Sequence, residues 1–110
     1  MKLLIDEQLP HRLRHLIAPH EAATVSYMGW NALVNGDLLR RAADAGFDVL
    51  ITNDGNLPYE QNTRNLPCSV VILQAASNDL SDVALQVPGL LEILKSLPPR
   101  SVAFVPRSMG

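Results

Sequence analysis

The sequence has one cysteine and no long apolar run, and each absence narrows the class of protein. Cys68 has no second cysteine with which to form an internal disulfide, so the fold must depend on its core. The start Met1-Lys2 is followed by no long apolar region before Asp6, which argues against secretion and against membrane insertion. We therefore expect a soluble, cytoplasmic protein with no membrane partner.

A strong charge imbalance is also lacking. The formal net charge is -2 and the isoelectric point is near 5.8. Domains that clamp nucleic acid electrostatically have isoelectric points above about 9, so a polyanion would have to be met by a local patch or through a metal ion. No repeat or linker interrupts the 110 residues, which are enough for one domain with its own core. We predict a single domain over residues 1–110.

Short apolar segments alternate with amphipathic ones along the chain. Strands are predicted at residues 3–5, 22–26, 47–52, 69–73 and 101–105. Strands that alternate with helices require a parallel sheet with right-handed crossovers. The pattern therefore predicts an α/β fold, a three-layer α/β/α sandwich with a mainly parallel five-stranded sheet. Its simplest strand order is 2-1-3-4-5.

The helices are predicted from apolar spacing and from proline and glycine. The first is expected over residues 9–17, with Pro10 in its first turn. The second packs its leucines inward and ends at Gly46. A further helical segment opens at Asp79, and Pro88-Gly89 should divide it.

Aspartates follow two strands that are neighbours in the predicted order. Asp6 comes after the first strand, and Asp54 comes after the run Val49-Leu50-Ile51-Thr52-Asn53. Ligands of open parallel sheets bind outside the carboxyl ends of the strands, where the strand order reverses. Asp6 and Asp54 should meet there. Asp37, after the loop that follows the second strand, is expected at the same edge.

Each aspartate also has a purely structural interpretation. Asp6 could cap the first helix, but Pro10 would then delete the first hydrogen bond of that helix. Asp54-Gly55 is a common turn pair. Asp37 could simply complement the dipole of the second helix. The expected convergence of Asp6 with Asp54 favours a functional site over these alternatives.

Converging carboxylates need compensation. Two bare charges ~4 Å apart repel by about 4 kcal/mol at an effective dielectric constant of 20. Either a proton or a divalent cation must relieve this repulsion, and Mg²⁺ or Mn²⁺ suits ligands that are all oxygen atoms. Such an ion could polarise a phosphodiester and activate water, so the implied reaction is phosphodiester hydrolysis.

Three segments together resemble a known family. The run Leu3-Leu4-Ile5-Asp6-Glu7-Gln8-Leu9-Pro10, the helix start Gly36-Asp37-Leu38-Leu39 and the run Val49-Leu50-Ile51-Thr52-Asn53-Asp54 are similar to small bacterial PIN-like domain proteins. That family is often described as the toxins of toxin-antitoxin pairs. The resemblance covers about the first two-thirds of the chain.

The resemblance implies a PIN-type fold and a metal-dependent ribonuclease, with RNA as substrate and a cognate antitoxin as protein partner. The acidic positions of the family, catalytic and metal-binding, fall on Asp6, Asp37 and Asp54, with Glu7, Thr52, Asn53 and Asn56 beside them. Where relatives commonly show Thr-x-Asp-x-Asp-Phe, this chain has Asn56 in place of a fourth acid. One bound ion and weak nuclease activity are the expected consequences.

Two other classes of function remain as alternatives. A phosphoacceptor receiver domain shares the predicted architecture, but it needs a hydroxyl after the fourth strand and a lysine after the fifth. This chain has Gln74 and Pro106 there. A protein-binding module whose acidic edge is degenerate would explain both the low net charge and Asn56.

Contacts to partners have candidate surfaces too. RNA could bind a basic rim formed by Arg12, Arg14, Arg40, Arg41 and Arg64. The alternative interpretation is that these arginines belong to ordinary solvated helix faces. Tyr27 and Trp30 are expected to close over the core rather than to stack on bases. A leucine stripe over residues 90–97 would favour a homodimer if it were exposed.

Overall fold

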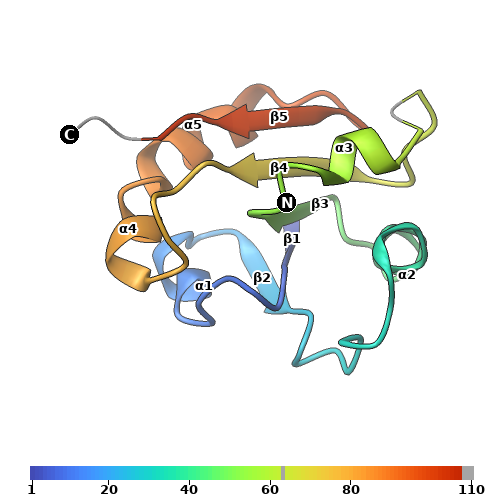
Figure 1. Ribbon diagram of the computed structural model, residues 1–110, viewed down its shortest axis with the longest axis horizontal. Coiled ribbons are helices and arrows are strands. Elements are labelled where there is room, and N and C mark those ends of the chain that lie inside the picture. The colour runs from blue at the N-terminus through green and yellow to red at the C-terminus, as the bar shows by residue number, and fades with distance from the viewer. Residues whose placement is uncertain (63, 108–110) are drawn as a thin grey trace.

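Five strands form one sheet in which every neighbouring pair is parallel (Figure 1). The computed structural model describes residues 1–62 and 64–107, apart from the side chain of Pro58. The observed order is β2-β1-β3-β4-β5, as predicted. The strands are β1 (Lys2–Ile5), β2 (Glu21–Thr24), β3 (Val49–Thr52), β4 (Ser69–Leu73) and β5 (Val102–Val105). The carboxyl ends of β1 and β3 therefore lie side by side.

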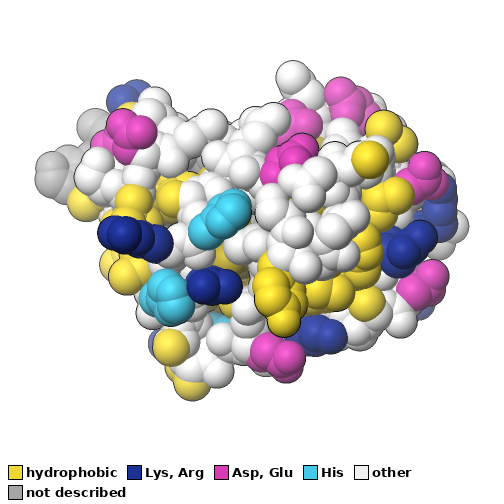
Figure 2. All heavy atoms as spheres, turned by 90° about the horizontal axis from the view of Figure 1, so that it is seen from below, with side chains coloured by type: hydrophobic (Ala, Val, Ile, Leu, Met, Phe, Trp, Pro, Cys, Tyr) yellow, Lys and Arg dark blue, Asp and Glu magenta, His cyan; other side chains and the backbone are white. Residues whose placement is uncertain are grey.

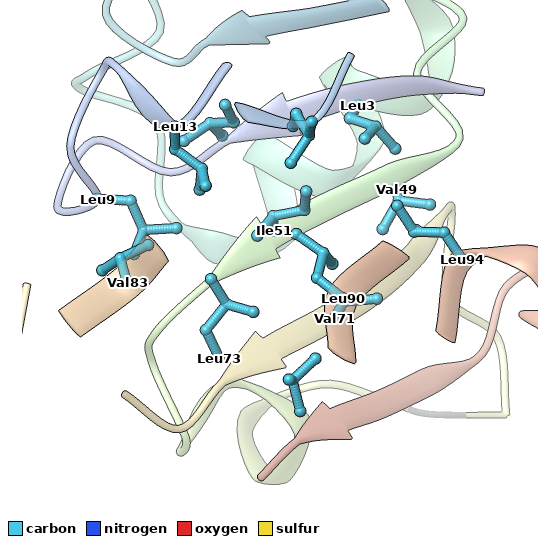
Figure 3. Packing of buried hydrophobic residues seen from close by; sticks show 13 residues of the cluster. Leu3, Leu9, Leu13, Val49, Ile51, Val71, Leu73, Val83, Leu90 and Leu94 are labelled. Atoms are coloured by element: carbon cyan, nitrogen blue, oxygen red, sulfur yellow. The ribbon is translucent and has the colours of Figure 1, made fainter. Parts of the chain in front are cut away.

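Helices cover both faces of the sheet. Side chains alternate between the faces along each strand, so these apolar strands present apolar side chains on both faces, and each face packs against helices. On one face, Leu3 and Ile51 pack against α1 (Leu13–Leu16), α4 (Leu80–Ala84) and α5 (Val87–Ser96) (Figure 3). On the other, Leu4 and Leu50 pack against α2 (Asn35–Asp44) and α3 (Leu57–Glu60). These two cores make the three layers. No helix in the described part of the chain is long and apolar enough to cross a membrane.

The end of α2 shows how local chemistry sets a boundary. Gly46 has a φ of 86°, and its amide donates to Ala43 at 3.0 Å while the amide of Phe47 donates to Ala42 at 2.9 Å. This pair of bonds is the Schellman arrangement, which glycine adopts without steric cost. The predicted end at Gly46 is confirmed. Phe47 closes the helix, so β3 begins at Val49 and not at residue 47.

Two predicted helix features are wrong. The segment expected to be helical over residues 9–17 is largely a series of turns, with the amide of Leu9 bonded to Asp6 and that of Leu13 bonded to Pro10, and only α1 is helical. The second error is the position of the break expected at Pro88-Gly89. The segment is divided as predicted, but at Leu85-Gln86, between α4 and α5. Pro88 instead lies in the first turn of α5, where the missing amide hydrogen costs nothing.

The leucine stripe over residues 90–97 does not form an exposed face. Leu90 is fully buried and Leu94 is 3% exposed, and both belong to the core between the sheet and α5 (Figure 3). This stripe is therefore not available for a homodimer.

Candidate acidic edge of the sheet

Asp6 and Thr52 meet at the carboxyl ends of β1 and β3. The Thr52 hydroxyl donates to Asp6 Oδ2 at 2.6 Å, and the amide of Glu7 donates to Asp6 Oδ1 at 2.8 Å. Thr52 is fully buried, whereas Asp6 is half-buried. Both carboxylate oxygens are thus held in place while the group still reaches solvent. Asp6 does not cap α1, whose N-cap residue is Arg12.

Asp54 joins this unit through its main chain. Its amide donates to the Thr52 hydroxyl at 3.1 Å, so the same oxygen atom contacts the end of β1 and the segment after β3. Asp54 Oδ1 accepts from the amide of Asn56 at 3.0 Å, which is the side-chain turn that its structural interpretation predicted. The Asn56 side chain is exposed. One carboxylate oxygen of Asp54 therefore shapes the turn, leaving the other for a ligand.

Asn53, directly after β3, contacts Asn78, which lies between β4 and α4. The carboxamide nitrogen of Asn53 donates to Asn78 Oδ1. The Oδ1 atom of Asn53 is buried and has no hydrogen-bond partner among the described residues. A buried carboxamide oxygen without a partner is uncommon in folded proteins and needs an explanation.

A second polar cluster lies beside Asp6. Asn31 donates to Glu7 Oε2 at 2.7 Å and to the Ser26 hydroxyl at 2.9 Å, so Glu7 is tied to the segment that follows β2. Asn31, Ser26 and Asn78 were not among the predicted site residues. Their only signal in the sequence is that polar side chains follow β2 and β4 shortly after each strand ends.

Asp37 is engaged elsewhere. It lies in the first turn of α2 and forms an ion pair with Arg40, and its side chain is 55% exposed. Within residues 1–62 and 64–107, no three His, Cys, Asp or Glu side chains are grouped closely enough to hold a metal ion. The structure therefore brings Asp6 and Asp54 to one edge without assembling all three predicted carboxylates into one cluster.

The five predicted arginines do not form one continuous rim. Arg12 and Arg14 are exposed at α1, where Figure 2 shows Lys or Arg and histidine side chains gathered on the left of the face. Arg40 and Arg41 belong to α2, which covers the opposite face of the sheet. Arg64 is exposed in the segment before β4. Only the α1 pair follows directly from the Asp6 segment.

The two aromatic side chains near β2 behave differently. Trp30 packs edge-on against Phe47 at a centroid distance of 6.0 Å and lies beneath the Arg41 guanidinium at 5.9 Å, so it closes over the core as expected. Tyr27 is 77% exposed, and the same expectation is wrong for it. Its amide donates to the buried Thr24 hydroxyl, which fixes the main chain without burying the ring.

Cys68 is not a nucleophile for this edge. Burial raises the pKa of its thiol to about 11, with a smaller contribution from the negative charge of Asp48, while a backbone hydrogen bond with Leu50 lowers it. The thiol stays protonated near neutral pH, and thiolate is the reactive form.

In comparisons with known proteins, no family model, curated protein or solved structure matches the chain. What the fold and the edge define is an α/β protein with two aspartates at adjacent strand ends.

Proposed function

We propose that this chain is a metal-dependent ribonuclease of PIN-like type, centred on Asp6 and Asp54. The observation that carries the proposal is the Thr52 hydroxyl, which contacts both the Asp6 carboxylate and the Asp54 amide. Because Thr52 is fully buried, this connection belongs to the core of the protein and not to a mobile surface. One buried hydroxyl therefore holds the Asp6 carboxylate and the main chain of Asp54.

The chemistry of the available atoms supports Mg²⁺ or Mn²⁺ as the cofactor. The edge offers carboxylate oxygens from Asp6 and Asp54 and the unpartnered carboxamide oxygen of Asn53. Hard divalent cations prefer oxygen ligands of these kinds. When bound, such an ion polarises a phosphodiester and lowers the pKa of the attacking water. Among the described residues no third acidic side chain is grouped with a pair of others closely enough to hold a metal ion, which favours a single ion here.

Each remaining residue would position the substrate or the ligands. The Thr52 hydroxyl and the Glu7 amide orient the Asp6 carboxylate, so its remaining lone pairs have a fixed direction. Arg12 and Arg14, exposed at α1, would contact phosphates, which fixes the register of an RNA strand without reading its bases. A cognate antitoxin would be the natural protein partner of such an enzyme.

A second candidate function, a catalytically inactive PIN-like module that binds a protein, is favoured by two observations. Asp37 is paired with Arg40 on α2, and Asn56 is an exposed amide where relatives tend to have a carboxylate. Metal-dependent melting separates the two functions. A site that binds Mn²⁺ raises Tm as its concentration increases, whereas a module without a site shows no change.

The decisive experiment compares wild type with Asp6→Asn and Asp54→Asn. We expect calorimetric titration to show Mn²⁺ binding to wild type and an affinity at least about 10- to 100-fold weaker in both variants. Labelled single-stranded RNA should be cleaved by wild type and not by either variant, and DNA of the same sequence should be spared.

Matched controls define what the result means. Glu92→Gln removes an exposed carboxylate on α5 and should change neither metal binding nor cleavage. Asp37→Asn tests the third predicted acid directly, and we expect Mn²⁺ affinity within about twofold of wild type because Asp37 is not grouped with the other two. Mn²⁺ binding that survives in both Asp6→Asn and Asp54→Asn would refute the proposed site.

A further inference from the structure

A cavity lined by other residues lies away from the acidic edge. It is an open groove of about 500 Å³ that is lined by residues of α2, by residues 61–62 and 65–67, and by Arg100. This volume is within the range of about 300–1,000 Å³ that is typical of small-molecule and cofactor sites. No residue of the groove takes part in the contacts of Asp6 and Asp54.

Gln61 and Arg40 can approach the first turn of α2 closely because Gly36 has no side chain. A Cβ atom at this position would lie 3.3 Å from Gln61 Oε1 and 3.8 Å from an Arg40 guanidinium nitrogen. The carboxamide and the guanidinium therefore approach the first turn of α2 together. Asn35 also donates to Glu60 Oε2 at 2.9 Å, which holds the end of α3 against the start of α2.

The lining chemistry is selective. Three carboxamides, from Gln61, Asn62 and Asn65, supply both donors and acceptors, and two arginines supply donors only. Ala43, Leu66 and Pro67 add an apolar surface to the lining, but a wholly apolar ligand would leave the carboxamides and arginines without partners. The Asp44 carboxylate in the lining disfavours a ligand of high negative charge. A nucleotide fits this lining. Its planar base carries both hydrogen-bond donors and acceptors, and it has a single phosphate.

Arg100 is the second arginine of the lining. Its main chain has a φ of 55°, a conformation that non-glycine residues rarely adopt, at the turn before β5. Arg100 forms no ion pair among the described residues, whereas Arg40 is paired with Asp37. Arg100 is therefore the cation of the groove that is free to contact an added anion.

We propose that this groove binds one nucleotide of a single-stranded RNA, with Arg100 on the phosphate and the carboxamides on the base edge. This inference rests on the proposed ribonuclease function and extends it to a substrate subsite. The connection is α3, which begins three residues after Asp54 and ends next to Gln61. Since α3 is one turn, about 6 Å long, an RNA strand bound at the edge reaches the Gln61 side of the groove within a few nucleotides. Arg100 precedes β5, so the phosphate contact lies toward the amino-terminal ends of the strands.

Binding is best measured without catalysis. A fluorescein-labelled single-stranded RNA of eight nucleotides is titrated with protein in EDTA, and fluorescence anisotropy reports the Kd. Gly36→Leu fills the groove, Gln61→Ala removes a carboxamide, and Arg100→Gly removes the guanidinium while suiting the positive φ. We expect each variant to weaken binding about tenfold. Gln61→Ala and Arg100→Gly each remove a hydrogen bond to the RNA, whereas Gly36→Leu occupies space that the nucleotide needs. Lys95→Gln, a charge loss on α5, should leave the Kd unchanged.

The outcomes separate this inference from the proposed function. Weaker RNA binding in the groove variants, with unchanged Tm, supports the subsite even if Mn²⁺ never produces cleavage. RNA that is cleaved by wild type and bound equally well by all groove variants refutes the subsite and leaves the ribonuclease proposal intact. Binding of adenosine or guanosine monophosphate without any binding of RNA also refutes the subsite, because the groove would then be a site for free nucleotides. Absence of binding to either probe refutes it as well.

Discussion

Removal of the Thr52 hydroxyl is the sharpest test of how the acidic edge is built. Thr52→Val keeps the branched shape and deletes one oxygen atom, which donates to Asp6 Oδ2 at 2.6 Å and accepts from the Asp54 amide at 3.1 Å. Because Thr52 is fully buried, no water replaces the hydroxyl at its own position. The substitution therefore acts on both aspartates without changing a charge.

The expected size of the effect comes from the two lost bonds. A hydrogen bond to a charged group contributes about 1.5–3 kcal/mol, but Asp6 is half-buried, so solvent recovers part of this for the carboxylate. We expect the free energy of unfolding to fall by about 2 kcal/mol. In a domain of this length that corresponds to a decrease of roughly 8 °C in Tm. Mn²⁺ affinity should weaken about tenfold, since the hydroxyl orients a ligand.

Thr24→Val is the matched control. Thr24 is 3% exposed at the end of β2, and its hydroxyl accepts only a neutral bond from the Tyr27 amide at 3.0 Å. This variant should lose about 1 kcal/mol and keep the Mn²⁺ affinity of wild type. Thermal melts and calorimetric titrations of wild type, both valine variants and Thr52→Ser give the comparison. Equal Tm losses with wild-type affinity in both valine variants would refute the role assigned to Thr52.

Other positions give independent expectations. Asn56→Asp should tighten Mn²⁺ binding about tenfold by adding a carboxylate beside Asp54; an unchanged affinity in calorimetry would place position 56 outside the site. Gly46→Ala should destabilise by about 1 kcal/mol because φ is 86°, whereas Gly55→Ala, with open space at its Cβ, should not; equal urea midpoints would contradict this. The pKa of the Cys68 thiol rises from 9.0 to about 11 on folding, so the unfolded chain loses this proton at a lower pH than the folded protein does. The thiol's contribution to the free energy of unfolding should be fully present below pH 9 and should be lost as pH rises through 11. Cys68→Ala should reduce this alkaline decline in urea melts, and an equal decline would exclude the thiol.

Much of the framework follows from the sequence alone. The order of the strands, the parallel sheet and the end of α2 at Gly46 were all predictable. Each depends on an interaction that is local or periodic: β-strand alternation sets the two faces, the βαβ connection sets handedness, and glycine alone suits the positive φ. The same reasoning placed Asp6 beside the segment that carries Asp54, because neighbouring parallel strands end at the same edge.

Tertiary structure decided what local rules leave open. Pro10 and the leucines over residues 9–17 are compatible with a long helix. In the structure, backbone hydrogen bonds between residues three apart form turns in most of that segment, and only α1 is helical. Asp37 follows β2 in the chain as an edge residue would, but the packing of α2 keeps it out of a cluster with Asp6 and Asp54 among the described residues, and it pairs with Arg40 within the same helix. The Thr52 bond to Asp6 and the unpartnered oxygen of Asn53 join residues far apart in the chain, and their geometry depends on how two strand ends pack. Residue types and periodicity determine which groups reach the edge; only packing decides which of them touch.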